Sequence, residues 1–323
     1  MENKYSNKYI IETGMGLQDV DGLKNSTYFI NESEKYVKGE ITLDELEEVI
    51  TSYYKNKPEE KERTEEADIV SARIAKLISD DSFTFSIGQF VSIHKQLFEG
   101  VFAHAGKLRT YNFTKKEWVL DGASVLYSDY RLIETTLQYD FEAERKFDYS
   151  HLSKDELVDH LAIFISNLWQ IHAFEEGNTR TTAVFVIKYL RSLGYDVTND
   201  AFAKNAWYFR NALVRANYRH LRKGVFEDRS FLIKFLRNLI LNENNQLHNR
   251  DLHISPVLQP QESSRETKIL MLMGNNPSIK LDEIAEQLNV SLRTIKNAVS
   301  ALIKEGKVER LGGKKMGYWK IKQ

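Results

Sequence analysis

Apolar residues recur three and four positions apart over much of the chain, which is the spacing of one buried face of an α-helix. The stripes are strongest at 69–78, 90–97, 157–168 and 231–239. Thr42 with Glu45 three positions later has the pattern of a capping box and predicts that another helix begins there. The chain is therefore predicted to be mainly α, built as a helical bundle.

One stretch departs from helical spacing and predicts a β-hairpin. Residues 118–120 and 125–127 are β-prone, and Asp121-Gly122 between them suits a type I′ turn. Such a hairpin either covers neighbouring loops or offers an edge strand to an extended peptide.

A polar stretch divides the chain near residue 250. Residues 242–263 hold two of the four prolines and no helical period, which indicates a linker. Beyond it, the pattern predicts helices over 265–273, 281–288 and 291–305, then two β-prone runs around a glycine-rich turn. We therefore expect a helical preface (1–57), a main helical domain (65–241), the linker, and a final domain (264–323) that resembles a winged helix-turn-helix.

Charge separates the final domain from the rest of the chain. Residues 264–323 hold 12 Lys and Arg against 6 Asp and Glu, a net charge of +6, while the remainder holds 33 against 40, a net charge of −7. A basic module indicates an anionic partner, here duplex DNA, although winged helices also dock proteins. The residues expected at DNA are Arg293, Thr294, Lys296 and Asn297 on the last helix and Lys314 and Lys315 at the wing tip.

Composition excludes several classes of protein. The chain is 42% hydrophobic and 28% charged, as is ordinary for a globular protein. The lack of cysteine excludes disulfides, thiolate metal sites and cysteine nucleophiles. No stretch approaches the ~18 apolar residues of a membrane span, and no apolar targeting segment opens the chain. We expect a cytoplasmic protein with no membrane partner.

Candidate chemistry gathers at residues 172–180, between two apolar helical runs. His172 closes the first helix and can remove a proton from a hydroxyl group near neutral pH. Gly177 and Asn178 stand where the second helix begins, so free backbone N–H groups can bind an anion there. Glu176 suits Mg²⁺, and Arg180 suits phosphate oxygens. Together these features favour nucleotidyl or phosphoryl transfer, although on spacing alone such a His is more often a structural helix cap.

The segment His172-Ala-Phe174-Glu-Glu176-Gly177-Asn178-Thr-Arg180 resembles the signature of the Fic family, H-x-F-x-[D/E]-G-N-x-R-x-x-R. The resemblance extends over roughly 86–240 and includes Gly106-Lys-Leu-Arg109, which is similar to the family's G-x-x-R element. The predicted hairpin is similar to the family's target-binding flap, whose residues here are Lys116, Glu117, Trp118 and Val119.

The resemblance implies transfer of AMP from ATP to a Ser, Thr or Tyr hydroxyl of a target protein, with Mg²⁺ as cofactor. It makes His172 the general base, Glu176 the Mg²⁺ ligand and Phe174 a buried anchor. The nucleotide-binding residues that it implies are Gly177, Asn178, Thr179, Arg180 and Asn211. A homodimer is one oligomeric state that the sequence leaves open.

Two departures from the family pattern bear on mechanism. Ala183 replaces the second arginine, so the orientation and identity of the nucleotide stay open. The family's inhibitory pattern, [S/T]-x-x-x-E-[G/N], is matched only loosely by Leu17, Asp21 and Gly22, so we expect a preface that packs without the usual inhibitory contact. Two alternatives to AMP transfer follow: a transcriptional regulator that senses a nucleotide, and a phosphotransferase like the Doc branch of the family.

Overall fold

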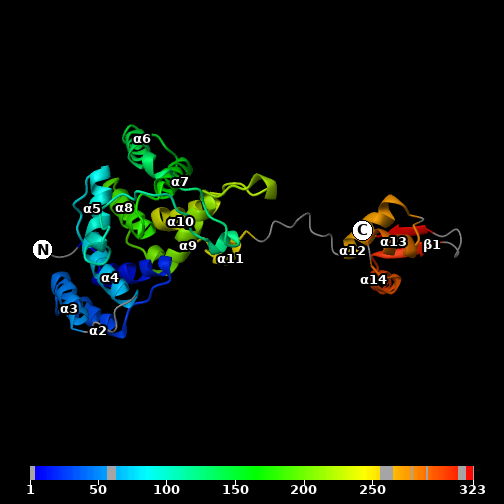
Figure 1. Cartoon of the computed structure of the whole chain (residues 1–323), viewed down its shortest axis with the longest axis horizontal. Coiled ribbons are helices and arrows are strands. Elements are labelled where there is room, and N and C mark those ends of the chain that lie inside the picture. The colour runs from blue at the N-terminus through cyan, green and yellow to red at the C-terminus, as the bar shows by residue number, and fades with distance from the viewer. Residues whose placement is uncertain are drawn as a thin grey trace. The chain divides into compact units, whose positions relative to one another are not determined.

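The computed structural model describes residues 4–56, 63–254, 265–277, 279–288, 290–311 and 318–322. Contacts between Cα atoms divide the chain into two compact units, Met1–Ile254 and Ser255–Gln323. The described residues are mainly helical, as the apolar spacing predicts (Figure 1). None of the described helices combines the length and the apolar character needed to cross a bilayer.

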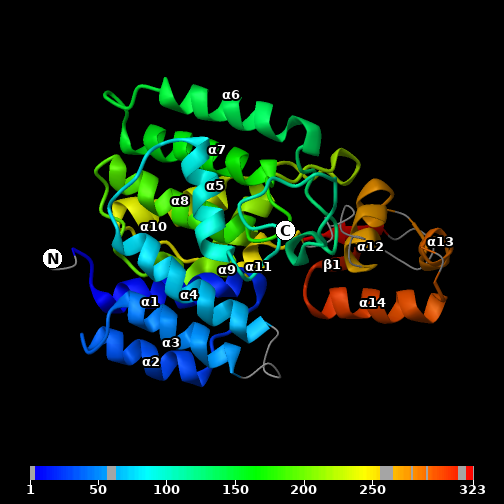
Figure 2. The same ribbon diagram turned by 60° about the vertical axis from the view of Figure 1, so that its left-hand side comes forward.

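The first unit is a helical bundle, and each apolar stripe of the sequence lies on one of its helices. The stripes belong to α4 (Arg63–Ser79), α5 (Ile87–Phe98), α7 (Lys154–Ile171) and α10 (Ser230–Leu241). α6 (Ile133–Arg145) lies along α7, and α5 packs on α8 (Asn178–Ser192) (Figure 1 and Figure 2). α9 (Ala201–Ala216) packs against α7 and α10 and completes the core.

Among the residues described before this bundle, 4–56, lie the helices α1 (Asn7–Gly16), α2 (Thr27–Val37) and α3 (Leu43–Lys55), with a 3₁₀ turn at Leu17–Asp21 after α1. The predicted capping box opens α3, because Thr42 accepts the backbone N–H of Glu45 and the Glu45 carboxylate accepts that of Thr42.

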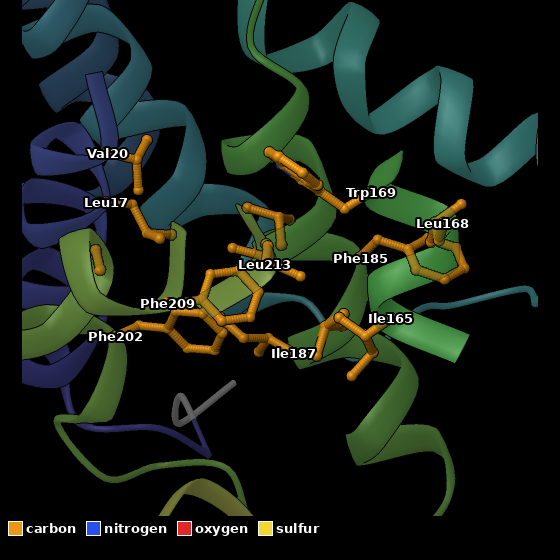
Figure 3. Packing of buried hydrophobic residues seen from close by; sticks show 14 of the residues in the cluster. Leu17, Val20, Ile165, Leu168, Trp169, Phe185, Ile187, Phe202, Phe209 and Leu213 are labelled. Atoms are coloured by element: carbon orange, nitrogen blue, oxygen red, sulfur yellow. The ribbon is translucent and has the colours of Figure 1, made fainter. Parts of the chain in front are cut away.

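The preface shares the core of the bundle. α1 lies so close to α4 and α9 that a Cβ on Gly14 would be 2.5 Å from a carbonyl oxygen of α4, and one on Gly16 would be 2.3 Å from a carbonyl oxygen of α9. Leu17 and Val20 belong to the same buried cluster as side chains of α7, α8 and α9 (Figure 3). The preface is therefore part of the first unit rather than a detachable arm.

The segment predicted as a β-hairpin contains no β-strand, and this part of the prediction is wrong. Trp118–Leu120 forms a 3₁₀ turn, although Asp121 and Gly122 take the positive φ values, 52° and 80°, that the dipeptide predicts. Val119 and Leu120 are buried in the core of the first unit. Burial of the two side chains therefore outweighs their β propensity, which depends strongly on context.

The first part of the predicted linker packs on the first unit. Residues 249–252 form α11 (Asn249–Leu252), and Leu252 is fully buried. The backbone N–H of Ile254 donates to the carbonyl of Val119 at 2.7 Å, which ties this segment to the flap. The rest of the predicted linker lies outside the described residues.

The second unit has the element order of a winged helix. α12 (Arg265–Asn275), α13 (Leu281–Gln287) and α14 (Leu292–Lys304) precede the antiparallel strands β1 (Val308–Leu311) and β2 (Tyr318–Ile321). Ser291 caps α14 by accepting the backbone N–H of Thr294. Trp319 is buried in this core and donates its indole N–H to the carbonyl of Ile279 at 3.0 Å.

Candidate active site

The corner between α7 and α8 brings the motif residues together. His172 ends α7 in the left-handed conformation, with φ 50°, and Gly177 precedes α8 with φ 75°. A Cβ on Gly177 would lie 2.3 Å from the ring of Phe98, so only glycine fits. The side-chain amide of Asn178 closes the corner by bonding both the N–H and the carbonyl of Phe174, at 2.9 and 2.7 Å.

His172 is almost completely buried in an aromatic cage. Its ring stacks on Tyr127 with the centroids 3.9 Å apart, and Phe113 and Trp169 contact it edge-on. Burial, with the nearby charge of Lys115, lowers the pKa of His172 well below its ordinary value. Neither ring nitrogen has a hydrogen-bond partner among the described residues. The side chain is therefore a neutral imidazole at physiological pH, as a general base requires.

Glu176 presents its carboxylate at the exposed side of the corner. Its backbone carbonyl accepts a hydrogen bond from His94 Nε2 at 3.0 Å, because His94 Nδ1 accepts the N–H of Gly106 and leaves the proton on Nε2. The Glu176 side chain is 49% exposed, and one of its oxygens lies 2.8 Å from Nζ of Lys115. An exposed carboxylate fits Mg²⁺, which commonly binds one or two carboxylates together with substrate phosphates.

Arg180 has a different environment from the phosphate site expected for it. Its side chain is 1% exposed, and the guanidinium lies 2.6 Å from Glu66, 2.9 Å from Asp21 and 3.0 Å from Gln18. The sequence did not predict this ion pair between the preface and the first arginine of the motif. The acidic residue of the preface still reaches the motif, at its first arginine instead of the second, where Ala183 is buried.

Arg109, the arginine of the G-x-x-R element, donates hydrogen bonds to the backbone of the motif and of the residue before it. Its side chain donates to the carbonyls of His172 at 2.7 Å and Ile171 at 3.2 Å, and its backbone N–H donates to Ala173 at 2.9 Å. These bonds satisfy carbonyl groups at the end of α7 that have no partner within the helix. Arg109 thus holds the backbone of the corner in place.

The four predicted flap residues alternate between solvent and core. Lys116 and Trp118 are exposed, whereas Glu117 and Val119 are buried. Glu117 forms an ion pair with Arg210 of α9 at 2.5 Å. Of these four side chains, only those of Lys116 and Trp118 therefore face outward.

Thr179 and Asn211, also expected at the nucleotide, have buried side chains as Asn178 and Arg180 do. The hydroxyl of Thr179 accepts the indole N–H of Trp169 at 2.9 Å, which leaves its backbone N–H as the group that an anion can use. Asn211 donates to Asn249 of α11 at 2.8 Å, and its Oδ1 has no partner among the described residues. Asn211 thus lies behind α11 rather than on an open surface.

The second unit presents part of the predicted DNA face. Arg293, Lys296 and Asn297 are exposed on α14, whereas Thr294 is half-buried and its hydroxyl bonds that of Ser291. The predicted wing residues Lys314 and Lys315 lie outside the described residues.

Sequence reasoning missed three residues that shape the candidate site: Lys115, Tyr127 and Glu66. For Lys115, the alternation of an extended segment predicts that it and Lys116 face opposite sides, but it does not say which of the two faces the corner. Glu66, in the first turn of α4, carries no local signal, because acidic residues are common at that position of any helix.

Comparisons with known proteins match two segments of the chain. The Fic/DOC family model matches residues 84–190, and an HTH domain model matches residues 265–319. No curated protein matches the chain.

Among solved structures, the N-terminal FIC domain of the Bep8 effector from Bartonella sp. 1-1C is 19% identical, with a TM-score of 0.43, over 57% of this chain and 88% of that one. A Fic family protein from Desulfovibrio desulfuricans G20 is 12% identical, with a TM-score of 0.43, over 98% of this chain and 87% of that one. The family models match the segments that hold the corner and the winged helix. The chain thus carries a segment that matches the Fic/DOC family, residues 84–190, and a segment that matches an HTH domain, residues 265–319.

Proposed function

We propose that the first unit transfers AMP from ATP to a Ser, Thr or Tyr hydroxyl of a target protein. The observation that carries this proposal is the buried, neutral His172 at the end of α7, in the corner that leads to the start of α8. In the proposed step, the ring takes the hydroxyl proton, the hydroxyl oxygen attacks the α-phosphorus, and pyrophosphate leaves. Backbone N–H groups of Gly177, Asn178 and Thr179 would bind the phosphate oxygens at the helix start.

Two further groups belong to this proposal. Glu176 would hold Mg²⁺, which offsets phosphate charge when it is bound. Tyr127 covers the ring of His172, so the flap has to shift before a target hydroxyl reaches the base. Side chains of α9 would wall the adenine, and α11 would have to move before the nucleotide could contact Asn211.

The test is incubation of the full chain with Mg²⁺, a lysate and ATP labelled on either the α- or the γ-phosphate. AMP transfer leaves the α label on protein, whereas phosphotransfer leaves the γ label. His172→Ala should lower labelling by ~10² to 10⁴-fold without loss of ATP binding, because it removes the base and no phosphate contact. His151→Ala, at an exposed histidine, is the matched control. Undiminished labelling by His172→Ala contradicts the mechanism.

A nucleotide-sensing regulator is the second candidate. The observation in its favour is that Arg180 is held by two carboxylates and Ala183 has no charge, so the motif itself offers phosphates little positive charge. In that case, ATP changes the affinity of the chain for DNA, and neither α-labelled nor γ-labelled ATP leaves label on protein.

We also propose that the second unit binds duplex DNA through α14, which fits the HTH match and its positive charge. Affinity should fall steeply with salt, because each neutralised phosphate releases about 0.9 counterion. Changing Lys314 and Lys315 to Ala in the full chain should weaken binding to all sequences alike. If the full chain shows no salt-sensitive binding at ~50 mM salt, the second unit is a protein dock instead.

A further inference from the structure

The phosphates of a nucleotide need positive charge, and the arginines around the corner are already engaged. Arg109 donates to backbone carbonyls that end α7. Arg180 is 1% exposed between Asp21 and Glu66. Arg210 pairs with Glu117, whose side chain is fully buried. Freeing any of these cations would leave buried acceptors or carboxylates without a partner, which is costly.

Lys115 differs from these arginines in the partner that it would leave. Its side chain is 24% exposed, and its ion pair is with Glu176, whose side chain is 49% exposed. Breaking a pair between partly exposed groups costs little, because water replaces the lost contact. The backbone N–H of Lys115 donates to Ser124 across the flap, which keeps the residue beside the corner.

We propose that Lys115 is the phosphate-binding cation of this site. In the nucleotide-free chain its ammonium group pairs with the Glu176 carboxylate. When that carboxylate binds Mg²⁺ instead, the ammonium group binds the nucleotide phosphates. This inference deepens the proposed AMP transfer and rests on it. Lys115, directly before the flap, would then provide the positive charge that Arg180 and Ala183 do not provide.

The electrostatics of the corner support this exchange. Lys115 is close enough to His172 for its charge to help lower the pKa of that ring, second to burial. A carboxylate that binds a divalent cation is a poor partner for an ammonium at 2.8 Å, because the two cations repel each other. Phosphate oxygens beside the same corner then become the better partner for the ammonium, through charge-assisted hydrogen bonds.

The first test measures ATP affinity by calorimetry on the full-length His172→Ala variant, in which binding is separated from turnover. With Mg²⁺ present, Lys115→Met should weaken ATP binding by roughly ten- to a hundredfold, the usual loss for a hydrogen bond to a charged group. Lys115→Arg should retain most of the affinity. Lys146→Met removes the same charge from an exposed position on the far end of α6 and should change nothing.

The second test removes the metal with a chelator. Glu176→Gln frees the Lys115 ammonium group without a metal, so without Mg²⁺ this variant should bind ATP more tightly than the His172→Ala chain from which it is made. Adding Lys115→Met to the Glu176→Gln variant should abolish that gain in affinity. An unchanged ATP affinity in Lys115→Met, or no metal-free gain in Glu176→Gln, overturns the inference and leaves AMP transfer standing. A chain that binds no ATP under any condition overturns both.

Discussion

Replacing Arg180 with alanine should destabilise the first unit far more than loss of a surface arginine does. The guanidinium is 1% exposed, and its carboxylate partners Asp21 and Glu66 are 19% and 14% exposed. Without it, two largely buried carboxylates face each other and Gln18 loses its partner. Breaking a buried ion pair in this way costs about 3 to 5 kcal/mol. For a unit of this size, that corresponds to a melting temperature lower by roughly 6 to 20 °C.

The assay is urea unfolding of the full chain, followed by far-ultraviolet circular dichroism. Arg250→Ala is the matched control: Arg250 is 84% exposed and its ion pair with Asp251 is a surface pair, so the loss should stay below about 1 kcal/mol. A loss below about 1 kcal/mol at neutral pH refutes the view that Arg180 is a buried structural cation.

Three further outcomes are expected. Gly177→Ala should cost about 2 to 4 kcal/mol of unfolding free energy, against about 1 to 2 for Gly224→Ala, because both have positive φ but only the first meets a ring; equal losses in urea contradict this. Burial lowers the pKa of His94 to about 4, so between pH 6.5 and 4 the unfolded chain binds a proton that the folded chain does not bind. The free energy of unfolding should therefore fall by up to about 3 kcal/mol over this range, and urea unfolding of His94→Gln should show a weaker dependence of that free energy on pH. Arg293→Ala or Asn297→Ala should relax DNA sequence preference by about 1 to 3 kcal/mol at one base pair, measured by competition between site variants; equal weakening at every sequence contradicts base readout.

Local sequence was sufficient for the helices and for the corner. The apolar stripes predict α4, α5, α7 and α10, since burial of one face depends on a spacing of three and four residues. His172 and Gly177 lie at the corner because the chain itself joins them within six positions. The order of helices and strands in the second unit was predictable for the same reason.

The flap shows where local propensity fails. Trp118–Leu120 is β-prone, yet it forms a 3₁₀ turn, because Glu117 pairs with Arg210, 93 positions away, and Val119 bonds Ile254. A three-residue preference is weak against a buried ion pair and a buried side chain. The turn dipeptide alone kept its expected conformation, since positive φ is a property of Asp121 and Gly122 themselves.

The sequence by itself determined which chemical groups stand at the corner, and only the tertiary structure decided which of them are available. Arg180 looks like a phosphate ligand beside His172, but Gln18 and Glu66, 162 and 114 positions away, bring their side chains to it. Lys115 reaches Glu176 across 61 positions, and this partner is 49% exposed, unlike the largely buried carboxylates that hold Arg180 and Arg210. Charge pairing and burial act through space, so the partners of a side chain depend on which distant helices pack beside it, and no local pattern records that.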